Sequence, residues 1–330
     1  MKTFLVCLVA WFPLIIVAEP ITQYSLTDVE ESVLYDDEFQ PSLLDPEQQK
    51  RRTQLLISSY IAGVGLYGYL AWWSKDVTRN IETDDGDFLR TETVSNRTSD
   101  FHVNNEGWFD LDTPNGGADK LGHAYSSYVS TRLMTQGFKW AGYSRQRAAK
   151  LAGLTTGAVM LGVEVMDGFT VEYGFSKEDL VMNLSGVGIG TLLELYPQWD
   201  DVFDIRFLYW RSDHAKQLGE RDPISDYSGQ TYLLVTKASG IPALRDHQFL
   251  RYFELAIGYG SRGYQPTPGK YEPQFPKERN LYYGISINLS QLLNDFMFGA
   301  DKLSRSQYVT EGILEYIQVP GTALLMEHHL

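Results

Sequence analysis

Three short segments of the sequence pair a carboxylate with a second polar side chain at the spacing of one helical turn: Asp119 with His123, Glu164 with Asp167, and Asp179 with Asn183. Residues three or four apart lie on the same face of a helix, so each pair predicts two neighbouring polar groups. A carboxylate beside an imidazole orients the ring and raises its basicity, which a general base or a metal ligand requires. The spacing therefore indicates acid–base chemistry or cation binding.

The apolar surroundings of these pairs strengthen that interpretation. The segments that carry them are rich in Gly, Ala, Leu and Val, where a carboxylate is costly to bury without a partner. Carboxylates with perturbed ionisation are typical of acid–base sites. The candidate site comprises Asp119, Lys120, His123, Glu164, Asp167, Asp179 and Asn183.

Each candidate residue has an expected role. We expect His123 to be a base or nucleophile that Asp119 orients, and Lys120 to bind an anionic head group. The other three carboxylates are expected to act as acid–base partners or to hold a divalent cation, and Asn183 to position one of them. The sequence does not fix whether a metal or another cofactor binds.

The same residues also have a structural interpretation. Asp119 lies near the expected start of a helix, where the helix dipole favours an acid. Asp179 follows Ser176 by three residues, which is close to a capping box. His123 is then a hydrogen-bonded core histidine, and the acids of the second segment mark the exit from a buried helix. In this interpretation the polar residues form a network that fixes the register of the helices.

Four helical patterns position these residues: Leu55–Trp73, Ala118–Phe138, Leu151–Met166 and Leu180–Leu195. The first has no charged residue, so it is long enough to span a bilayer, and the alternative is a buried core helix. Glycines recur in the last two, and small residues let helix backbones approach closely. The polar residues 74–117 separate the first two patterns and carry turn signals at 84–87 and 115–117.

The C-terminal residues change to a period of two. Arg251–Gly260 and Leu281–Leu289 alternate as half-buried strands do, and Tyr232–Thr236 is a third candidate strand. Tyr308–Val319 is expected to be a closing helix. So few strands cannot close a membrane barrel, which needs at least about eight. The sequence predicts an α+β fold, in which a compact multi-helix membrane-associated domain precedes a small β-containing unit.

The N-terminal residues indicate export. Residues 1–18 are expected to be a signal peptide, because an apolar run follows Lys2 and ends at Ala18. The one cysteine, Cys7, lies inside that run. We expect an acidic linker at 19–52, a helical domain at 53–200 and a C-terminal α+β region at 201–330.

The charge and the cysteine content exclude several classes of protein. A net charge of −14 argues against a nucleic-acid partner, which needs a basic surface. One cysteine excludes a disulfide framework and a zinc site built on cysteines. Export without structural disulfides fits the periplasm or outer membrane of a Gram-negative bacterium.

The ordered motifs carry a family resemblance. Asp119-Lys120-x-x-His123, Glu164-x-x-Asp167-Gly168 and Phe175-Ser176-x-x-Asp179-x-x-x-Asn183 follow one another in the chain. This order resembles the YfiM-like family of predicted periplasmic lipoproteins, which has no established function, and is distantly similar to VanZ-like membrane domains. The resemblance covers about residues 53–200. It implies a compact helical unit at a membrane and, for the VanZ-like group, a role on lipids or lipid-linked head groups.

This chain departs from the lipoprotein pattern in one respect. It has no cysteine after the apolar run of the signal sequence. Leu55–Trp73 or the C-terminal region is then expected to make the membrane contact.

Two functions fit the sequence. The first is a non-catalytic envelope protein, associated with a membrane and structural or docked to a partner that the sequence does not identify. The alternative is an envelope enzyme that acts on lipid or lipid-linked phosphate head groups through the candidate site. Candidate residues that converge on an accessible pocket would favour the enzyme, and a closed network would favour the structural role.

Overall fold

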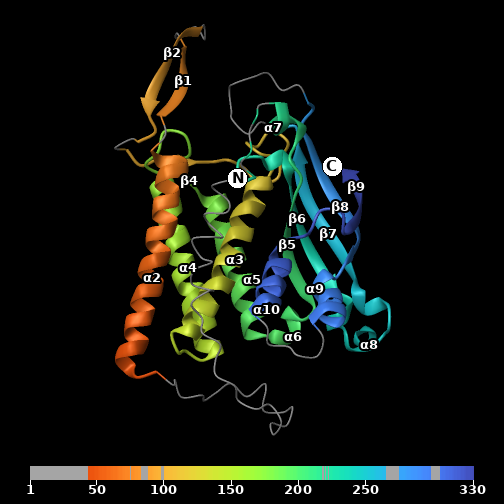
Figure 1. Ribbon diagram of the computed structural model, residues 1–330. Coiled ribbons are helices and arrows are strands. Elements are labelled where there is room, and N and C mark those ends of the chain that lie inside the picture. The colour runs from red at the N-terminus through yellow and green to blue at the C-terminus, as the bar shows by residue number, and fades with distance from the viewer. Residues whose placement is uncertain are drawn as a thin grey trace.

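A bundle of long helices stands beside a five-stranded antiparallel sheet (Figure 1). This computed structural model describes residues 44–74, 76–82, 88–97, 100–217, 219, 221, 223–264, 275–298 and 305–330. The expected signal peptide, residues 19–43 of the expected linker and the turn expected at 84–87 lie outside the described residues. The helical core and the C-terminal sheet confirm the expected α+β class.

The bundle consists of four helices: α2 (Pro46–Gly68), α3 (Ala118–Trp140), α4 (Arg145–Asp167) and α5 (Lys177–Leu195). Each expected helical pattern therefore forms a helix. Side-chain caps define two of the starts, because Asp45 accepts a hydrogen bond from the backbone N–H of Gln48 and Ser176 accepts one from that of Asp179. The capping role expected for the Ser176–Asp179 segment is thus confirmed.

Glycines bring α3 and α5 into backbone contact. A Cβ atom on Gly186 would lie 2.0 Å from the carbonyl oxygen of Ala124, and one on Gly190 would lie 3.0 Å from that of Tyr128. No side chain fits in the first of these gaps, so the close approach requires glycine. This packing holds together the N-terminal halves of α3 and α5, which carry five of the seven candidate residues.

Helix α2 lies along α3 and α4 with most of its surface exposed. Its buried residues are Leu56, Tyr60 and Gly68, so the alternative of a helix buried in the core does not hold for most of its length. A single π-helical turn, η3 (Tyr69–Trp73), extends it and buries Trp73. By length and composition alone, the helix Pro46–Trp73 and helix α4 are each long and apolar enough to cross a membrane.

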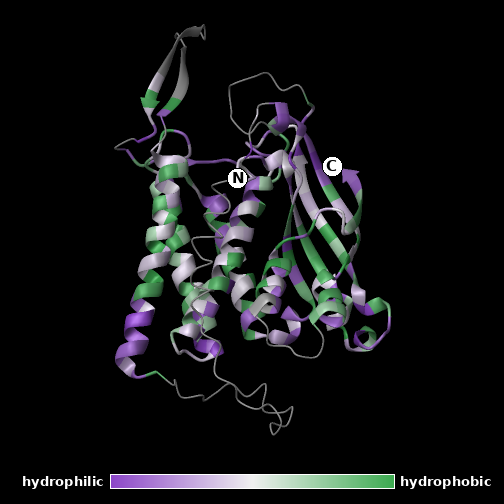
Figure 2. Cartoon of the chain, in the orientation of Figure 1, coloured by the Kyte–Doolittle hydropathy of each residue, from purple (hydrophilic) through white to green (hydrophobic). Residues whose placement is uncertain are grey.

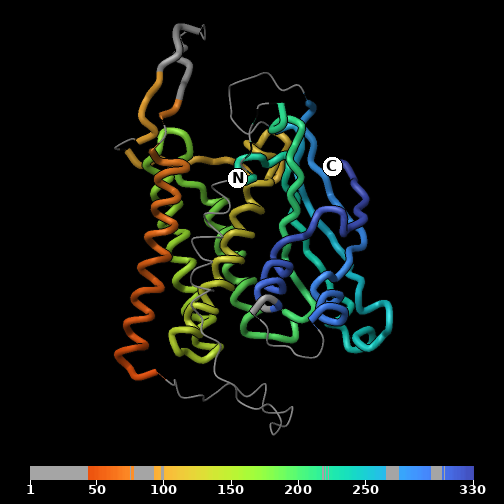
Figure 3. The backbone as a smooth tube through the Cα atoms, in the orientation of Figure 1, coloured from red at the N-terminus to blue at the C-terminus, as the bar shows by residue number. Residues whose placement is uncertain are grey.

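Short strands connect α2 to α3 and α4 to α5. Strands β1 (Asp76–Glu82) and β2 (Phe88–Ser95) form an antiparallel hairpin that projects beyond the end of the bundle (Figure 3). Strand β3 (Val103–Asn104) pairs in parallel with β4 (Phe175–Ser176), directly before α5. This pairing fixes the polar segment before α3 against the start of α5. The expected turn at 115–117 forms within that segment, with φ of +58° at Gly116 and +84° at Gly117.

The sheet is a meander of five strands in sequence order: β5 (Phe203–Tyr209), β6 (Gln230–Lys237), β7 (Phe253–Arg262), β8 (Glu278–Ile287) and β9 (Ala323–His329). The three expected strands correspond to β6, β7 and β8, whereas β5 and β9 were not predicted. The expected closing helix is α10 (Arg305–Tyr316). The remaining helical elements are short connections: α6 (Pro197–Asp200), α7 (Asp213–Gln217), η4 (Tyr227–Gly229), η5 (Ala238–Gly240), α8 (Pro242–Arg245), η6 (Leu250–Tyr252), α9 (Leu289–Leu293) and η7 (Asn294–Phe298).

The two faces of the sheet differ in character. One face packs on α3, where the ring of Tyr125 lies 5.6 Å from that of Phe207 and 5.8 Å from that of Tyr232. The opposite face buries Arg206, whose guanidinium lies 2.8 Å from both carboxylate oxygens of Glu254. The charged residues of the sheet interior are therefore paired, as buried charges must be.

Candidate functional site

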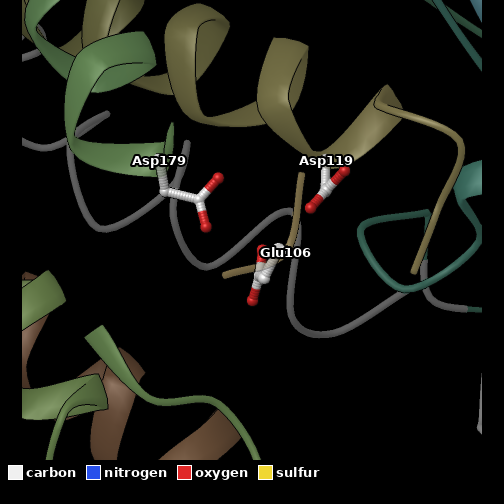
Figure 4. Close-up of side chains that lie close together, drawn as sticks. All are labelled: Glu106, Asp119 and Asp179. Atoms are coloured by element: carbon white, nitrogen blue, oxygen red, sulfur yellow. The ribbon is translucent and has the colours of Figure 1, made fainter. Parts of the chain in front are cut away.

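Three carboxylates from separate elements surround the ammonium group of Lys120. Lys120 lies in the first turn of α3 and is fully buried. Its Nζ lies 3.0 Å from Asp119 Oδ2 and 2.8 Å from Asp179 Oδ1, and it makes its shortest contact with Glu106. Figure 4 shows the three carboxylates gathered from the segment before α3, the start of α3 and the start of α5.

His123 lies one turn further along α3, between two other carboxylates. Its Nδ1 is 3.4 Å from Glu164 Oε1 and its Nε2 is 3.8 Å from Asp179 Oδ2. Its side chain is 27% exposed, whereas that of Glu164 is 1% exposed. The structure therefore gives the orienting role expected of Asp119 to Glu164 and Asp179, because Asp119 contacts Lys120 instead.

Asn183 extends the contacts across the three helices. Its Nδ2 donates to Glu164 Oε1 on α4 at 2.8 Å, and its Oδ1 accepts from the hydroxyl of Ser127 on α3 at 2.8 Å. Asn183 thus contacts Glu164, which is one of the three carboxylates that it was expected to position. Asp167 makes its direct contact elsewhere, since its Oδ1 accepts the indole N–H of Trp73 at 2.6 Å.

Six of the candidate residues, all except Asp167, are joined by direct contacts that also include Glu106 and Ser127. We call these eight residues the polar network: Glu106, Asp119, Lys120, His123, Ser127, Glu164, Asp179 and Asn183. It links α3, α4, α5 and the segment before α3. An open groove of about 840 Å³ between α4 and α5 is lined by none of these residues. The network therefore lies apart from that groove, and most of its side chains are buried.

Burial dominates the ionisation of three acids in and beside the network. It raises the pKa of Glu164 to about 8, although the charge of His123 opposes the shift. Burial and the charge of Asp179 raise the pKa of Glu106 to about 7, against the opposing effect of Lys120. Burial also raises the pKa of Asp167 to about 6, and the hydrogen bond from Trp73 limits that rise.

For Lys120, His123 and Asp179, the charges of neighbouring side chains outweigh burial in setting the pKa. Burial alone would lower the pKa of Lys120 and of His123, but the surrounding carboxylates outweigh it and raise both pKa values. Burial would raise the pKa of Asp179, but His123 and Lys120 outweigh it and hold that pKa below its usual range. The first turns of α3 and α5 thus contain an ionised lysine–aspartate pair, with groups nearby that titrate near neutral pH.

The carboxylate cluster also has the spacing of a cation site. One oxygen each from Glu106, Asp119 and Asp179 lies within 4.8 Å of the other two, as the ligands of a divalent ion would. The ammonium of Lys120 contacts all three carboxylates, so a metal ion would have to displace it. The three carboxylates therefore fit the ammonium group that they already contact.

Three residues beside the candidates were not predicted. Glu106 comes from a polar segment without periodicity, and the β3–β4 pairing, together with the hydrogen bond from Asn104 to the carbonyl of Tyr173, brings it to the site. Trp73 lies beyond the last α-helical turn of α2, in the π-helical turn. Ser127 follows His123 by four residues on α3, and the helical spacing alone would have found it.

The comparisons with known proteins concern the segment that holds the polar network. No curated protein and no solved structure matches the chain. The network spans residues 106 to 183. Residues 105–195 match the model of a family described as "Predicted periplasmic lipoprotein (DUF2279)", which supports export of the chain to the periplasm or the outer membrane.

Proposed function

We propose that this chain is a non-catalytic protein of the bacterial envelope that lies against membrane lipid, and that the polar network holds its helices in register. The observation that carries the proposal is the polarity of strands β7 and β8. Their outward side chains, which lie on the same face of the sheet as Tyr232 and Tyr259, are apolar and exposed. The opposite, buried face holds Glu254 and Ser286 beside the apolar Ala256, so the exposed positions carry apolar residues where a sheet that faces water on one side carries polar ones.

The exposures along these two strands support the inversion. Leu255 and Ile257 of β7 are each 63% exposed, and Ile285 of β8, opposite Leu255, is 50% exposed. On the other side of the same strands, Glu254 and Ser286 are at most 2% exposed and are joined by a hydrogen bond of 2.7 Å. Figure 2 shows the apolar residues in the middle of these strands.

The exposed apolar side chains of β7 and β8 favour a partner that is itself apolar. Each Å² of apolar surface removed from water contributes about 25 cal/mol, and contiguous exposed patches mark protein or membrane contact sites. The outward residues of β9 continue the patch, with Leu324 85% and Met326 59% exposed. Acyl chains of lipid can cover all three strands at once, which supports membrane contact as the role of this surface.

The closure of the polar network supports the non-catalytic part of the proposal. Lys120 and Asn183 are fully buried, and Glu164 is 1% exposed. Their polar groups pair with one another across three helices. Paired buried polar groups favour one arrangement of their elements, and among the carboxylate oxygens of this network Asp119 Oδ1 is buried without a hydrogen bond.

Vesicle flotation of the full chain tests membrane contact. The double variant Ile257→Glu, Ile285→Glu places two charges on the outward face, and its matched control, Gln217→Glu, Gln248→Glu, adds the same charge at exposed positions elsewhere. We expect the control to float with phosphatidylglycerol vesicles as the native protein does and the first variant to remain in the dense fraction, with unchanged circular dichroism. Flotation of the first variant at the native level would contradict the proposal.

A second candidate function is an enzyme that acts on lipid-linked phosphate head groups. His123 favours it, because this ring is 27% exposed and lies between two carboxylates that raise its basicity. The resemblance of the sequence motifs to VanZ-like membrane domains implies a role on lipid-linked head groups and would favour the same function. Cells that lack the protein would then differ in lipid composition, and a His123→Gln variant with native thermal stability would fail to restore it. Full restoration by that variant would exclude the enzyme.

A further inference from the structure

An open apolar groove runs between α4 and α5 on the outside of the bundle. Its volume is about 840 Å³, and leucines such as Leu154 and Leu184 form its walls, with exposures of 74% and 51%. The groove lies outside the polar network and away from the sheet. It therefore needs an explanation of its own.

Glycines keep the floor of this groove open. A Cβ atom on Gly188 would meet nothing within 4 Å, and one on Gly157 would meet only Leu184 Cδ2, at 3.8 Å. Their neighbour Gly186 on α5 differs, since α3 leaves no room for a side chain there. Packing within the chain thus explains Gly186 but does not explain the two glycines in the groove.

The charge of the groove restricts what it can bind. Lys150 is the one charged residue among the twelve that line it, and it lies toward the N-terminal end of α4. Within the described part of the chain, Lys150 makes no ion pair and is exposed. An occupant that complements this lining is apolar along its length and negative at the end near Lys150.

The end of the bundle near Lys150 has the composition of a membrane interface. The guanidinium of Arg52 lies over the ring of Trp140 at 4.7 Å, and that of Arg147 lies over the ring of Tyr143 at 5.2 Å. Figure 2 shows the hydrophilic first turns of α2 at this end, below its apolar remainder. Basic and aromatic side chains beside an apolar zone are typical of the level of lipid head groups.

We infer that the groove between α4 and α5 binds an acyl chain of an anionic phospholipid, with the ammonium of Lys150 on the phosphate. The acyl chain covers the leucine walls and lies against the backbone at Gly157 and Gly188. The inference rests on the proposed membrane contact and adds a specific lipid site to it.

Native mass spectrometry of the full chain in detergent, with added phosphatidylglycerol, tests the site. Gly188→Leu fills the groove from its floor, where no atom obstructs the new side chain. Gly162→Leu is the matched control, because this glycine of α4 is also unobstructed but does not line the groove. Replacing a helical glycine by leucine favours the helix, so both variants are expected to fold.

We expect Gly188→Leu to bind phosphatidylglycerol at least about tenfold more weakly than the native chain, because the apolar contact surface is lost. Gly162→Leu should bind as the native chain does. Lys150→Gln should bind phosphatidylglycerol and the zwitterionic phosphatidylcholine equally, because the charge-assisted contact is gone.

Native-level binding by Gly188→Leu would overturn the inference, as would a native chain that binds both lipids equally. A native dimer that Gly188→Leu dissociates would also overturn it, since a second copy would then occupy the groove. Flotation distinguishes these results from failure of the proposed function. A chain that floats with vesicles but shows no effect of Gly188→Leu keeps its membrane role and lacks this lipid site.

Discussion

The Nζ atom of Lys120 lies 2.8 Å from Oδ1 of Asp179, and the side chains of this pair are 0% and 7% exposed. The pair joins the first turn of α3 to the first turn of α5. Two further carboxylates, Glu106 and Asp119, contact the same ammonium. Its removal therefore leaves several buried acids without a counter-charge.

Replacement of Lys120 by methionine is expected to destabilise the protein strongly. Breaking a buried ion pair by removing one partner costs about 3–5 kcal/mol, because the remaining charge is left uncompensated. Chemical denaturation of Lys120→Met followed by circular dichroism measures the loss. Adding Asp179→Asn should restore part of it, because one of the uncompensated acids is then neutral.

Lys177→Met serves as the surface control for that substitution. The Lys177 side chain is 64% exposed and its Nζ lies 4.0 Å from Glu178. We expect its replacement to change the unfolding free energy by less than about 0.5 kcal/mol. A Lys120→Met variant as stable as this control would show that the buried pair does not hold the two helices.

Stability is expected to fall as the pH rises from about 5 to 8. The pKa of Glu164 is about 8 in the folded chain, well above the value of about 4.3 for an exposed glutamate. Between these values the folded state keeps a proton that the unfolded chain has lost, so unfolding becomes easier with rising pH. His123 acts in the same direction, because its pKa is raised and its favourable charge is lost above that value.

Glu164→Gln isolates this contribution. Its amide oxygen can still accept the hydrogen bond from Asn183, but the group no longer titrates. We expect the decline of Tm with pH to flatten by roughly half, because Glu106 and His123 still titrate. Thermal melts of both proteins between pH 5 and 9 make the comparison, and parallel Tm curves would contradict the role of Glu164.

Replacement by alanine is expected to destabilise the protein at Gly186 of α5 and to stabilise it at Gly188. At Gly186 the new Cβ would lie 2.0 Å from a backbone oxygen of α3, so Gly186→Ala should cost at least about 2 kcal/mol. At Gly188 nothing lies within 4 Å, so Gly188→Ala should stabilise the chain by up to about 1 kcal/mol. Denaturant midpoints measure both, and equal midpoints would mean that α3 and α5 do not pack this closely.

The indole of Trp73 is expected to control the ionisation of Asp167. Its N–H donates to Asp167 at 2.6 Å and opposes the rise of this pKa to about 6. Trp73→Phe removes the donor, so the pKa of Asp167 should rise further. Titration of the carboxyl carbon by NMR reports the value, with Trp72→Phe as the control. An unchanged pKa in Trp73→Phe would exclude the hydrogen bond as a cause.

Periodicity predicted the helices well and the sheet only in part. The four helical patterns are long and keep one period, so each forms a helix. Strand β5 escaped prediction because Asp204 and Arg206 occupy its buried positions, where a half-buried strand normally carries apolar residues. Only the folded chain shows that these charges are paired with each other and with Glu254.

The sequence predicted which residues form the candidate site, but not which of them contact one another. Helical spacing identified residues that do meet, yet it also suggested that Asp119 orients His123. The partners of both residues come from other elements, which spacing along one helix cannot show. Glu106 in particular depends on the parallel pairing of two-residue strands, far too short to carry a pattern.

The contacts of the polar network have a consequence for the order of folding. Its hydrogen bonds join residues separated by 1 to 56 positions, whereas the bond from Arg206 to Gln318, which ties the last segment to the first strand of the sheet, spans 112. Closing a longer loop costs more chain entropy and slows folding. The helical unit can therefore assemble before the segment at Gln318 docks on strand β5, and that docking is a late step of folding.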